Sequence, residues 1–321
     1  MNISQLVDEM FEAFLGGLGG PLAFYARDLP RVLRLASRPN CPWSDVFMHE
    51  VTLGAPALLA EGMDLPPDIV RDAVLAHALA VIDAFGTDRI EDDQVPPSAE
   101  LLAVLGCARR DRDRAMVRIF GGPPVPGCSF AASDAEVAKA IRRERAFVGS
   151  ARPVDLATYE RESLGKQAPG LPASLALAHI AGWSDARCES AKTTLESIWL
   201  GLQMYDDVVD WEDDFARGGS WAVCLMKGDP GHVSIVERNA GAAQLRSLVL
   251  ESGTLGRMLT RAVHHMAVAQ RQAHALGAPR LAGWAGDRRA RFETLCAAEK
   301  RNAGYAVRAH ALTAWAGEVL A

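Results

Sequence analysis

The sequence predicts an all-α protein. Apolar residues recur three and four positions apart in many segments, which is the period of an α-helix, and runs rich in β-branched residues are scarce. Hydrophobic residues make up 49% of the 321 residues and charged residues 23%, so the chain carries enough apolar material for a substantial core. We therefore expect a bundle of helices.

Helical periodicity runs from the start of the chain to its end. The expected helices span residues 2–16, 43–60, 67–85, 97–118, 133–148, 171–181, 185–216, 231–276 (expected to be broken) and 286–319. Ser133 and Glu136 have the spacing of a capping box, which predicts a helix start at Ser133. No Pro- or Gly-rich stretch is long or polar enough for an interdomain linker, so we expect one domain over residues 1–321.

Charge and cysteine usage exclude several classes of protein. The net charge of −6 lacks the basic footprint of a nucleic-acid binder. Six cysteines lie far apart with no CxxC pair, which argues against a zinc site or a disulfide scaffold and favours reduced thiols. The acidic start of the chain does not resemble a signal peptide, and no apolar run reaches the length of a transmembrane segment. We expect a cytoplasmic protein.

The most informative stretch, residues 203–214, places six acidic residues within nine positions. Asp206, Asp210 and Asp214 are four residues apart, so on a helix they form one column of carboxylates. Like charges at this spacing repel, and a cation should therefore lie against them. Oxygen ligands without His or Cys suit Mg²⁺. Asp207 points about 100° away from the column, which predicts a supporting role.

A second acidic segment ends the apolar helix that precedes Asp83. Asp88 and Asp92 are four residues apart, whereas Asp83 lies about 140° round the helix from Asp88. Asp83 can join them only if Gly86 loosens the helix. Two acid-ended apolar helices predict one cavity with the two sets of carboxylates facing each other across its rim. The plainer alternative for this segment is a solvated face.

The stretch Leu200–Asp210 resembles the second aspartate-rich motif of trans-prenyltransferases, and Asp206, Asp210 and Asp214 also fit the metal triad of terpene cyclases. On these residues the chain resembles the class I isoprenoid synthase superfamily over roughly residues 65–310. The resemblance implies a single-domain helical bundle with a central apolar cavity. It also implies Mg²⁺ as cofactor, a prenyl diphosphate as substrate and, by analogy, a homodimer.

Three further residues are candidates through the resemblance. Lys166 stands 40 residues before Asp206, close to where prenyltransferases carry a diphosphate-binding lysine, and Arg161 stands 45 before it, close to the diphosphate-sensing arginine of bacterial cyclases. Gln203 lies one turn before Asp207 and could orient a ligand or a metal-bound water. The alternatives are a surface lysine, an arginine paired with its flanking glutamates, and a buried amide bonded to a neighbouring helix.

Departures from the family pattern bear on the reaction. Asp83 and Asp88 resemble a stretched DDx₄D that lacks its first acid, while Asp88 and Asp92 resemble the DxxxD of the squalene/phytoene branch. The basic motifs that hold isopentenyl diphosphate, Arg-Arg-Gly and Gly-Lys-Arg-x-Arg-Pro, do not occur. The alternating charges of Arg109–Arg114 predict a solvated ion-pair face, with an arginine that reaches diphosphate as the alternative.

We therefore expect a Mg²⁺-dependent class I terpene synthase that ionises and cyclises a linear prenyl diphosphate. One alternative is a prenyltransferase of the same fold with a non-isopentenyl acceptor or a second allylic diphosphate. The other is a non-catalytic partner or regulatory subunit. The expected metal ligands are Asp83, Asp88, Asp92, Asp206, Asp210 and Asp214, and the expected catalytic residues are Arg161, Lys166 and Gln203.

Overall fold

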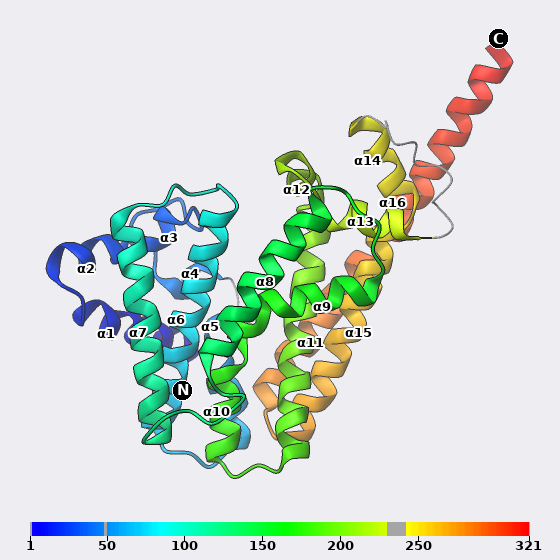
Figure 1. The fold of residues 1–321 in the computed structure, drawn as a ribbon. Coiled ribbons are helices and arrows are strands. Elements are labelled where there is room, and N and C mark those ends of the chain that lie inside the picture. The colour runs from blue at the N-terminus through cyan, green and yellow to red at the C-terminus, as the bar shows by residue number, and fades with distance from the viewer. Residues whose placement is uncertain (1, 48–49, 230–241, 321) are drawn as a thin grey trace. The chain divides into compact units, whose positions relative to one another are not determined.

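A computed structural model gives the structure of the protein. It describes residues 2–47, 50–229 and 242–320, with side chains to residue 304 except those of residues 242, 243 and 303. Every regular element in these ranges is a helix, and none is a strand (Figure 1). The predicted all-α class is confirmed. Within the same ranges no helix combines the length and the apolar character needed to cross a bilayer.

The chain forms two compact units, and each draws on separate parts of the sequence. Unit 1 comprises Met1–Ala138, Gln167–Glu196 and Arg271–Gly283, and unit 2 comprises Lys139–Lys166, Ser197–Gln270 and Trp284–Ala321. The first acidic segment therefore belongs to unit 1 and the second to unit 2. The expectations of one domain, and of two segments that face each other, stay predictions.

Unit 1 is built around two long helices, α6 and α7, which lie side by side in Figure 1. Its helices are α1 (Ile3–Gly16), α2 (Gly20–Arg27), α3 (Leu29–Val32), α4 (Trp43–Val46), α5 (Val51–Leu59), α6 (Pro67–Glu91), α7 (Ala99–Phe120) and α10 (Pro172–Ile180), with the short 3₁₀ helices η1 (Ala60–Gly62) and η2 (Ala168–Gly170). The middle of α6 is buried on all sides in this unit, since every residue from Ala76 to Asp83 is buried.

Gly86 determines how closely α6 approaches α7. A Cβ at this position would lie 2.7 Å from Cδ2 of Leu105, closer than van der Waals contact permits. Helix α6 runs unbroken past Gly86 to Glu91, so this glycine does not loosen the helix as the sequence analysis required for Asp83 to join Asp88. It provides room for α7 instead.

Unit 2 contains the second acidic segment and a core of aromatic and methionine side chains. Its helices are α9 (Leu156–Gln167), α12 (Trp211–Arg217), α13 (Trp221–Gly228), α14 (Ala242–Glu251), most of α8 (Phe130–Val148) and α15 (Thr254–Ala275), the second half of α11 (Asp185–Val209) and most of α16 (Pro279–Leu320). Tyr205 stacks on Phe292 with ring centroids 5.1 Å apart. Gly201 admits Met266, whose Cε would lie 2.6 Å from a Cβ there.

Several predicted boundaries are wrong. The helix predicted at 67–85 continues to Glu91, the one at 185–216 divides at Asp210, and the one at 286–319 begins at Pro279. The helix predicted at 43–60 forms α4 and α5. Of the segment predicted at 231–276, residues 231–241 lie outside the described part, and α14 and α15 lie in the remainder.

The capping box predicted at Ser133 is also wrong. Helix α8 begins at Phe130, and the Ser133 hydroxyl donates to the Phe130 carbonyl oxygen at 2.8 Å inside the first turn. Helices α2, α3, α9 and α13 were not predicted from the sequence. Of these, α9 matters most to the site, because it carries Arg161 and Lys166.

Candidate functional site

The backbone of the second acidic segment keeps the spacing that a carboxylate column requires. Helix α11 ends at Val209 and α12 begins at Trp211, but the amide of Asp210 donates to the Asp206 carbonyl at 2.9 Å. The amide of Asp214 donates to the Asp210 carbonyl at the same distance. These are α-helical bonds four residues apart, so the three aspartates succeed one another at one-turn intervals across the break.

The side chains of this column differ in exposure. Asp206 and Asp210 are exposed, whereas Asp214 is partly buried and pairs with Arg217 at 2.5 Å. Burial raises the pKa of Asp214, and the neighbouring charges of Arg217 and Lys166 act against that rise. Lys166 therefore lies within electrostatic range of the column.

Asp207 turns inward, as the helical spacing predicts. Its side chain is only 7% exposed and accepts two hydrogen bonds, from the Tyr159 hydroxyl at 2.5 Å and from Nε2 of Gln203 at 3.0 Å. Burial raises the pKa of Asp207 to about 8, although the hydrogen bond from Tyr159 opposes the shift. Neutral donors thus hold this buried carboxyl group.

Gln203 lies on the same helix as the group it contacts. Its Nε2 donates to Oδ1 of Asp207, one turn further along α11. Tyr159 was missed in the sequence analysis. It is fully buried and packs edge-to-face on Trp221 with centroids 5.3 Å apart. It is 48 residues from Asp207 in sequence, so no local pattern pointed to it.

Lys166 lies in the last turn of α9, a helix that was not predicted from the sequence. Its Nζ is 2.6 Å from Oε2 of Glu144, and the Lys166 side chain is 19% exposed. The other carboxylate oxygen of Glu144 accepts a bond from Nε1 of Trp221 at 2.8 Å. Glu144, which was also missed, therefore fixes where the ammonium group of Lys166 lies.

Arg161 lies on α9 but does not share the surroundings of Lys166. Its side chain is 64% exposed, and its Nε donates to the adjacent Glu162 at 3.2 Å. Glu162 is buried and is also paired with Arg143 at 2.5 Å. Five residues along a helix correspond to about 140°, so Arg161 and Lys166 point in different directions. The pairing with a flanking glutamate agrees with the plainer interpretation of Arg161.

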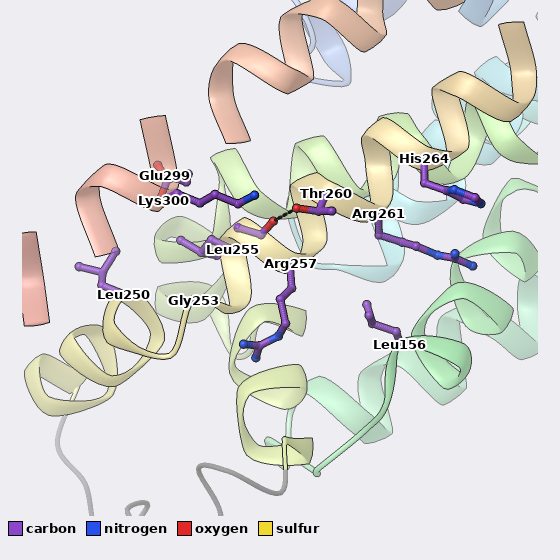
Figure 2. Close-up of a pocket in the computed structure, with 11 residues that line it drawn as sticks. Leu156, Leu250, Gly253, Leu255, Arg257, Thr260, Arg261, His264, Glu299 and Lys300 are labelled. Carbon is purple, nitrogen blue, oxygen red and sulfur yellow. Dashed lines mark hydrogen bonds between the residues drawn. The ribbon is translucent and has the colours of Figure 1, made fainter. Parts of the chain in front are cut away.

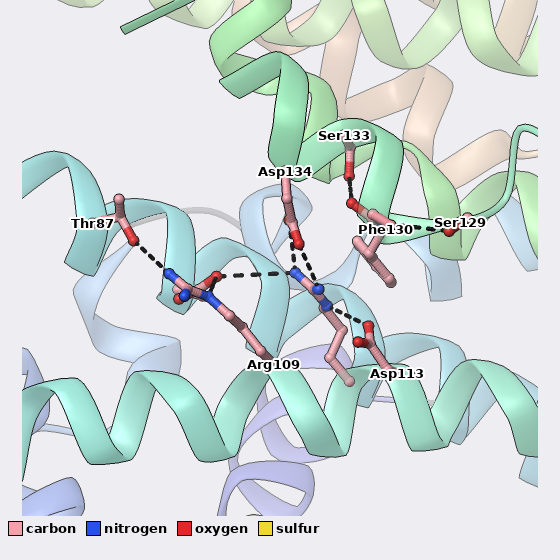
Figure 3. A network of polar contacts seen from close by, with 10 residues as sticks. Thr87, Arg109, Asp113, Ser129, Phe130, Ser133 and Asp134 are labelled. Atoms are coloured by element: carbon pink, nitrogen blue, oxygen red, sulfur yellow. Dashed lines mark hydrogen bonds and ion pairs between the residues drawn. The ribbon is translucent and has the colours of Figure 1, made fainter. Parts of the chain in front are cut away.

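In unit 1, Asp83 is separated from the other acids of its segment. It is buried against α7, with Nε of Arg109 at 2.8 Å and Nη1 of Arg112 at 3.9 Å (Figure 3). Burial raises its pKa despite the hydrogen bond from Arg109. Asp88 is partly buried, and Asp92 is exposed at the C-cap of α6, where its amide donates to the Asp88 carbonyl at 2.8 Å.

The prediction of a solvated ion-pair face for Arg109–Arg114 is wrong at Arg112, which is buried. The Arg112 side chain is 2% exposed and forms a bidentate salt bridge with Asp134. Its Nη1 and Nη2 donate to Oδ1 and Oδ2 of Asp134 at 2.9 and 2.8 Å. Its guanidinium carbon also lies 4.4 Å from the centroid of the Phe130 ring. Arg109 bonds Asp83, as described above. The alternation of charges in the sequence did not indicate which of these arginines face the core.

The described side chains do not form a preassembled metal cage. In residues 2–47 and 50–229, and in the described part beyond 242, no three His, Cys, Asp or Glu side chains converge on one point. The donor types still suit Mg²⁺ at Asp206 and Asp210, because Mg²⁺ takes only one or two carboxylates and completes its shell with water and phosphate oxygens. Asp83 does not suit a metal ion, since two arginines already face its carboxylate.

Unit 2 also contains a pocket of about 660 Å³ between α9, α14, α15 and α16 (Figure 2). Its walls include three leucines and three cationic side chains: Leu156, Leu250, Leu255, Arg257, Arg261 and Lys300. Arg257 and Arg261 are paired with Asp229 and Glu160. None of the site residues predicted from the sequence lines this pocket.

Comparison with known proteins identifies the fold. No protein-family model and no curated protein matches the chain. The geranylgeranyl pyrophosphate synthetase of the archaeon Geoglobus acetivorans superposes with a TM-score of 0.66 at 14% identity, over 89% of this chain and 95% of that one. The polyprenyl synthetase of Streptomyces coelicolor A3(2) gives 0.65 at 13%, over 88% and 97%. A Caulobacter crescentus CB15 polyprenyl synthase, solved with calcium and isoprenyl diphosphate, gives 0.57 at 16%, over 89% and 98%.

Proposed function

We propose that the chain is a Mg²⁺-dependent prenyltransferase of the class I isoprenoid synthase superfamily, on the basis of its structural similarity to the prenyl synthases named above. The proposed reaction ionises an allylic prenyl diphosphate and joins the prenyl group to an acceptor other than isopentenyl diphosphate. The observation that carries the proposal is the Asp206, Asp210, Asp214 column, in which two carboxylates are exposed while Asp207 is bonded inward.

Transfer is favoured over the cyclisation that the sequence analysis ranked first. The solved structures of this fold named above, together with a heptaprenyl diphosphate synthase from Staphylococcus aureus, bear the names of prenyl or polyprenyl synthases. These names support an enzyme of the transferase kind. The absence of Arg-Arg-Gly and Gly-Lys-Arg-x-Arg-Pro from the sequence is the reason for proposing a different acceptor.

In the proposed site, Asp206 and Asp210 hold Mg²⁺, and Asp214 supports them from the next turn. Bound Mg²⁺ would supply Lewis-acid stabilisation of the charge that develops on the departing diphosphate. Lys166 contributes a positive charge to the diphosphate oxygens, positioned by Glu144. Tyr159 and Gln203 keep Asp207 inward and so fix the rotation of α11 about its axis.

The bond changes of the proposed reaction are those of a substitution at an allylic carbon. The C–O bond to diphosphate breaks, and its electron pair leaves with the diphosphate. The allylic cation that remains is attacked by an electron pair of the acceptor, and a proton is then lost from the adduct. Such a cation survives only where water is excluded.

The proposal is tested with purified protein, Mg²⁺ and linear prenyl diphosphates of two to five isoprene units, with and without candidate acceptors. Diphosphate release that requires Mg²⁺ and increases when an acceptor is added supports transfer. Cyclised products without an acceptor would favour the terpene synthase. Tight binding of the substrates without turnover would favour the non-catalytic subunit, and neither release nor binding would contradict all three.

A further inference from the structure

The first acidic segment contains a buried carboxylate whose counter-charge comes from the protein itself. Asp83 lies on α6 and is almost fully buried, and Nε of Arg109 on α7 bonds its Oδ2 at 2.8 Å. Nη2 of the same arginine donates to the Thr87 hydroxyl at 3.2 Å. Asp83 and Thr87 are one turn apart on α6, so together they hold one edge of the Arg109 guanidinium group.

The opposite edge of Arg109 is open. Its side chain is 49% exposed, and among the described residues none accepts a hydrogen bond from its Nη1. An arginine fixed along one edge loses little side-chain freedom when the other edge binds an anion. Such a fork matches the geometry of a phosphate group.

The surrounding charges preserve this arrangement. Asp134 and Arg112 are the other charged groups close to Arg109. Arg112 is buried and engages both carboxylate oxygens of Asp134, so Asp134 does not compete for Arg109. Arg112 also approaches Asp83 to 3.9 Å, which leaves the Asp83 carboxylate with two positive neighbours and no need for a metal ion.

We infer that Arg109 occupies the place of a metal ion in the first acidic segment and binds a diphosphate group directly through its open guanidinium edge. Asp83 is then a positioning residue that holds Arg109 and does not ligate metal, and the metal ligands of this segment reduce to Asp88 and Asp92. This inference rests on the proposed function, because it assumes that the natural ligand carries a diphosphate.

The first experiment measures the affinity of the full chain for inorganic pyrophosphate in Mg²⁺ by calorimetry. Arg109→Gln should weaken binding roughly ten- to a hundred-fold, the range for loss of a charged hydrogen-bonding group. Arg109→Lys keeps the charge beside Asp83 and loses only the fork, so its affinity should fall by a smaller factor. Arg110→Gln, at the neighbouring exposed position of α7, is the matched control and should stay within about two-fold of the wild type.

The outcomes separate this inference from the function on which it depends. If the wild type binds pyrophosphate and both Arg109 variants bind it equally well, the inference is overturned and the proposed function stands. If the wild type does not bind pyrophosphate in Mg²⁺, both are overturned. Should Arg109→Gln fail to fold because Asp83 loses its partner, Arg109→Lys decides the question.

The second experiment counts bound metal by titrating Mn²⁺ against each protein in saturating pyrophosphate and recording the free ion by electron paramagnetic resonance. Asp83→Asn should bind as many Mn²⁺ ions as the wild type while its pyrophosphate affinity falls, because Arg109 loses its anchor. Asp88→Asn should bind fewer. Loss of a metal ion in Asp83→Asn would show that Asp83 is a ligand and would overturn the inference.

Discussion

Asp83 and Asp207 are both buried aspartates at the acid-rich end of a long helix, but their partners differ. Asp207 in unit 2 accepts bonds from Tyr159 and Gln203, which are neutral. Asp83 in unit 1 is paired with Arg109, which is charged. The neutral donors place no positive charge beside Asp207, whereas Arg109 places one beside Asp83.

The difference indicates where the proposed Mg²⁺ would bind. In unit 2 the protein provides carboxylates at one-turn spacing, with Arg217 beside the last of them and Lys166 held by Glu144. In unit 1 two arginines already lie beside the buried acid. Four predictions test this contrast, from the largest expected effect to the smallest.

The largest effect is expected at the exposed carboxylates of unit 2. Asp206→Ala or Asp210→Ala should lower the turnover of prenyl diphosphate by about a thousand-fold or more, because metal-bound charge stabilisation is worth several kcal/mol. Diphosphate release measures turnover, and circular dichroism checks the helical fold. Glu212→Ala is the control, since Glu212 is an exposed acid of the same segment paired with Arg246. Near-native activity in either aspartate variant would remove the metal-site assignment.

The next effect concerns stability in unit 1. Arg112→Ala removes a buried guanidinium group and leaves Asp134 without its two-pronged partner. We expect the free energy of unfolding in urea to fall by about 3 kcal/mol. Arg110→Ala, which is exposed, should change it by less than about 0.5 kcal/mol. Equal effects for the two variants would mean that the buried network contributes no more than surface charge does.

A third carboxylate, Glu160 in unit 2, is less completely buried than Asp83 and Asp207. It shows how charged partners change the pKa of a carboxyl group in that case. Burial alone would raise its pKa, but the hydrogen bonds from His265 and Arg261 outweigh it and lower the pKa to about 2. Its ordinary value of 4.5 applies to the unfolded chain. A lowered folded-state pKa stabilises the protein above pH 4.5, and this stabilisation is lost as the pH falls towards 2.

Glu160→Gln should therefore lower the free energy of unfolding by about 2 kcal/mol at neutral pH. The difference from the wild type should shrink by more than half at about pH 3, where the unfolded chain is already protonated. Urea unfolding of both proteins at the two pH values measures it. A difference that is independent of pH would show that the pairing with Arg261 and His265 does not stabilise the ionised form.

The smallest effect is expected from removing one neutral donor. Tyr159→Phe deletes the hydroxyl that bonds Asp207 and keeps the edge-to-face packing on Trp221. We expect unfolding free energy to fall by about 1–2 kcal/mol, and Mg²⁺-dependent turnover to fall with it because α11 is less firmly oriented. Tyr25→Phe, which removes a half-buried hydroxyl bonded to Ser98 in unit 1, should change stability less and leave turnover unaltered.

Elements with a long apolar stripe could be predicted from the sequence. The apolar residues of α6 and α11 predicted both helices and located the two acidic segments at their ends. The four-residue spacing of Asp206, Asp210 and Asp214 alone predicted that they follow one another at one-turn intervals. Helix α9 was missed because Leu156–Gln167 is rich in charge, contains Gly165 and has only four buried residues. A short polar helix of this kind depends on tertiary contacts more than on its own pattern.

The partners of the buried acids could not be predicted. Arg109 is 26 residues from Asp83 and Tyr159 is 48 from Asp207, so these pairs arise only when separate helices pack. Charge alternation in Arg109–Arg114 does not distinguish a buried guanidinium from a solvated one. The condition that Gly86 loosen α6 for Asp83 to join Asp88 is not met, and the role of Gly86 could not be predicted because it depends on Leu105 of another helix.

The central claim is that the carboxylate column of unit 2 uses Mg²⁺ to ionise a prenyl diphosphate. Its most direct test is the rate of diphosphate release from a linear prenyl diphosphate by the wild-type chain, measured with Mg²⁺, with a chelator, and again after Mg²⁺ is restored. The account predicts release with Mg²⁺, none with the chelator, and recovery on restoration. Release that is unchanged by the chelator, or no release from substrates of any length, would contradict it.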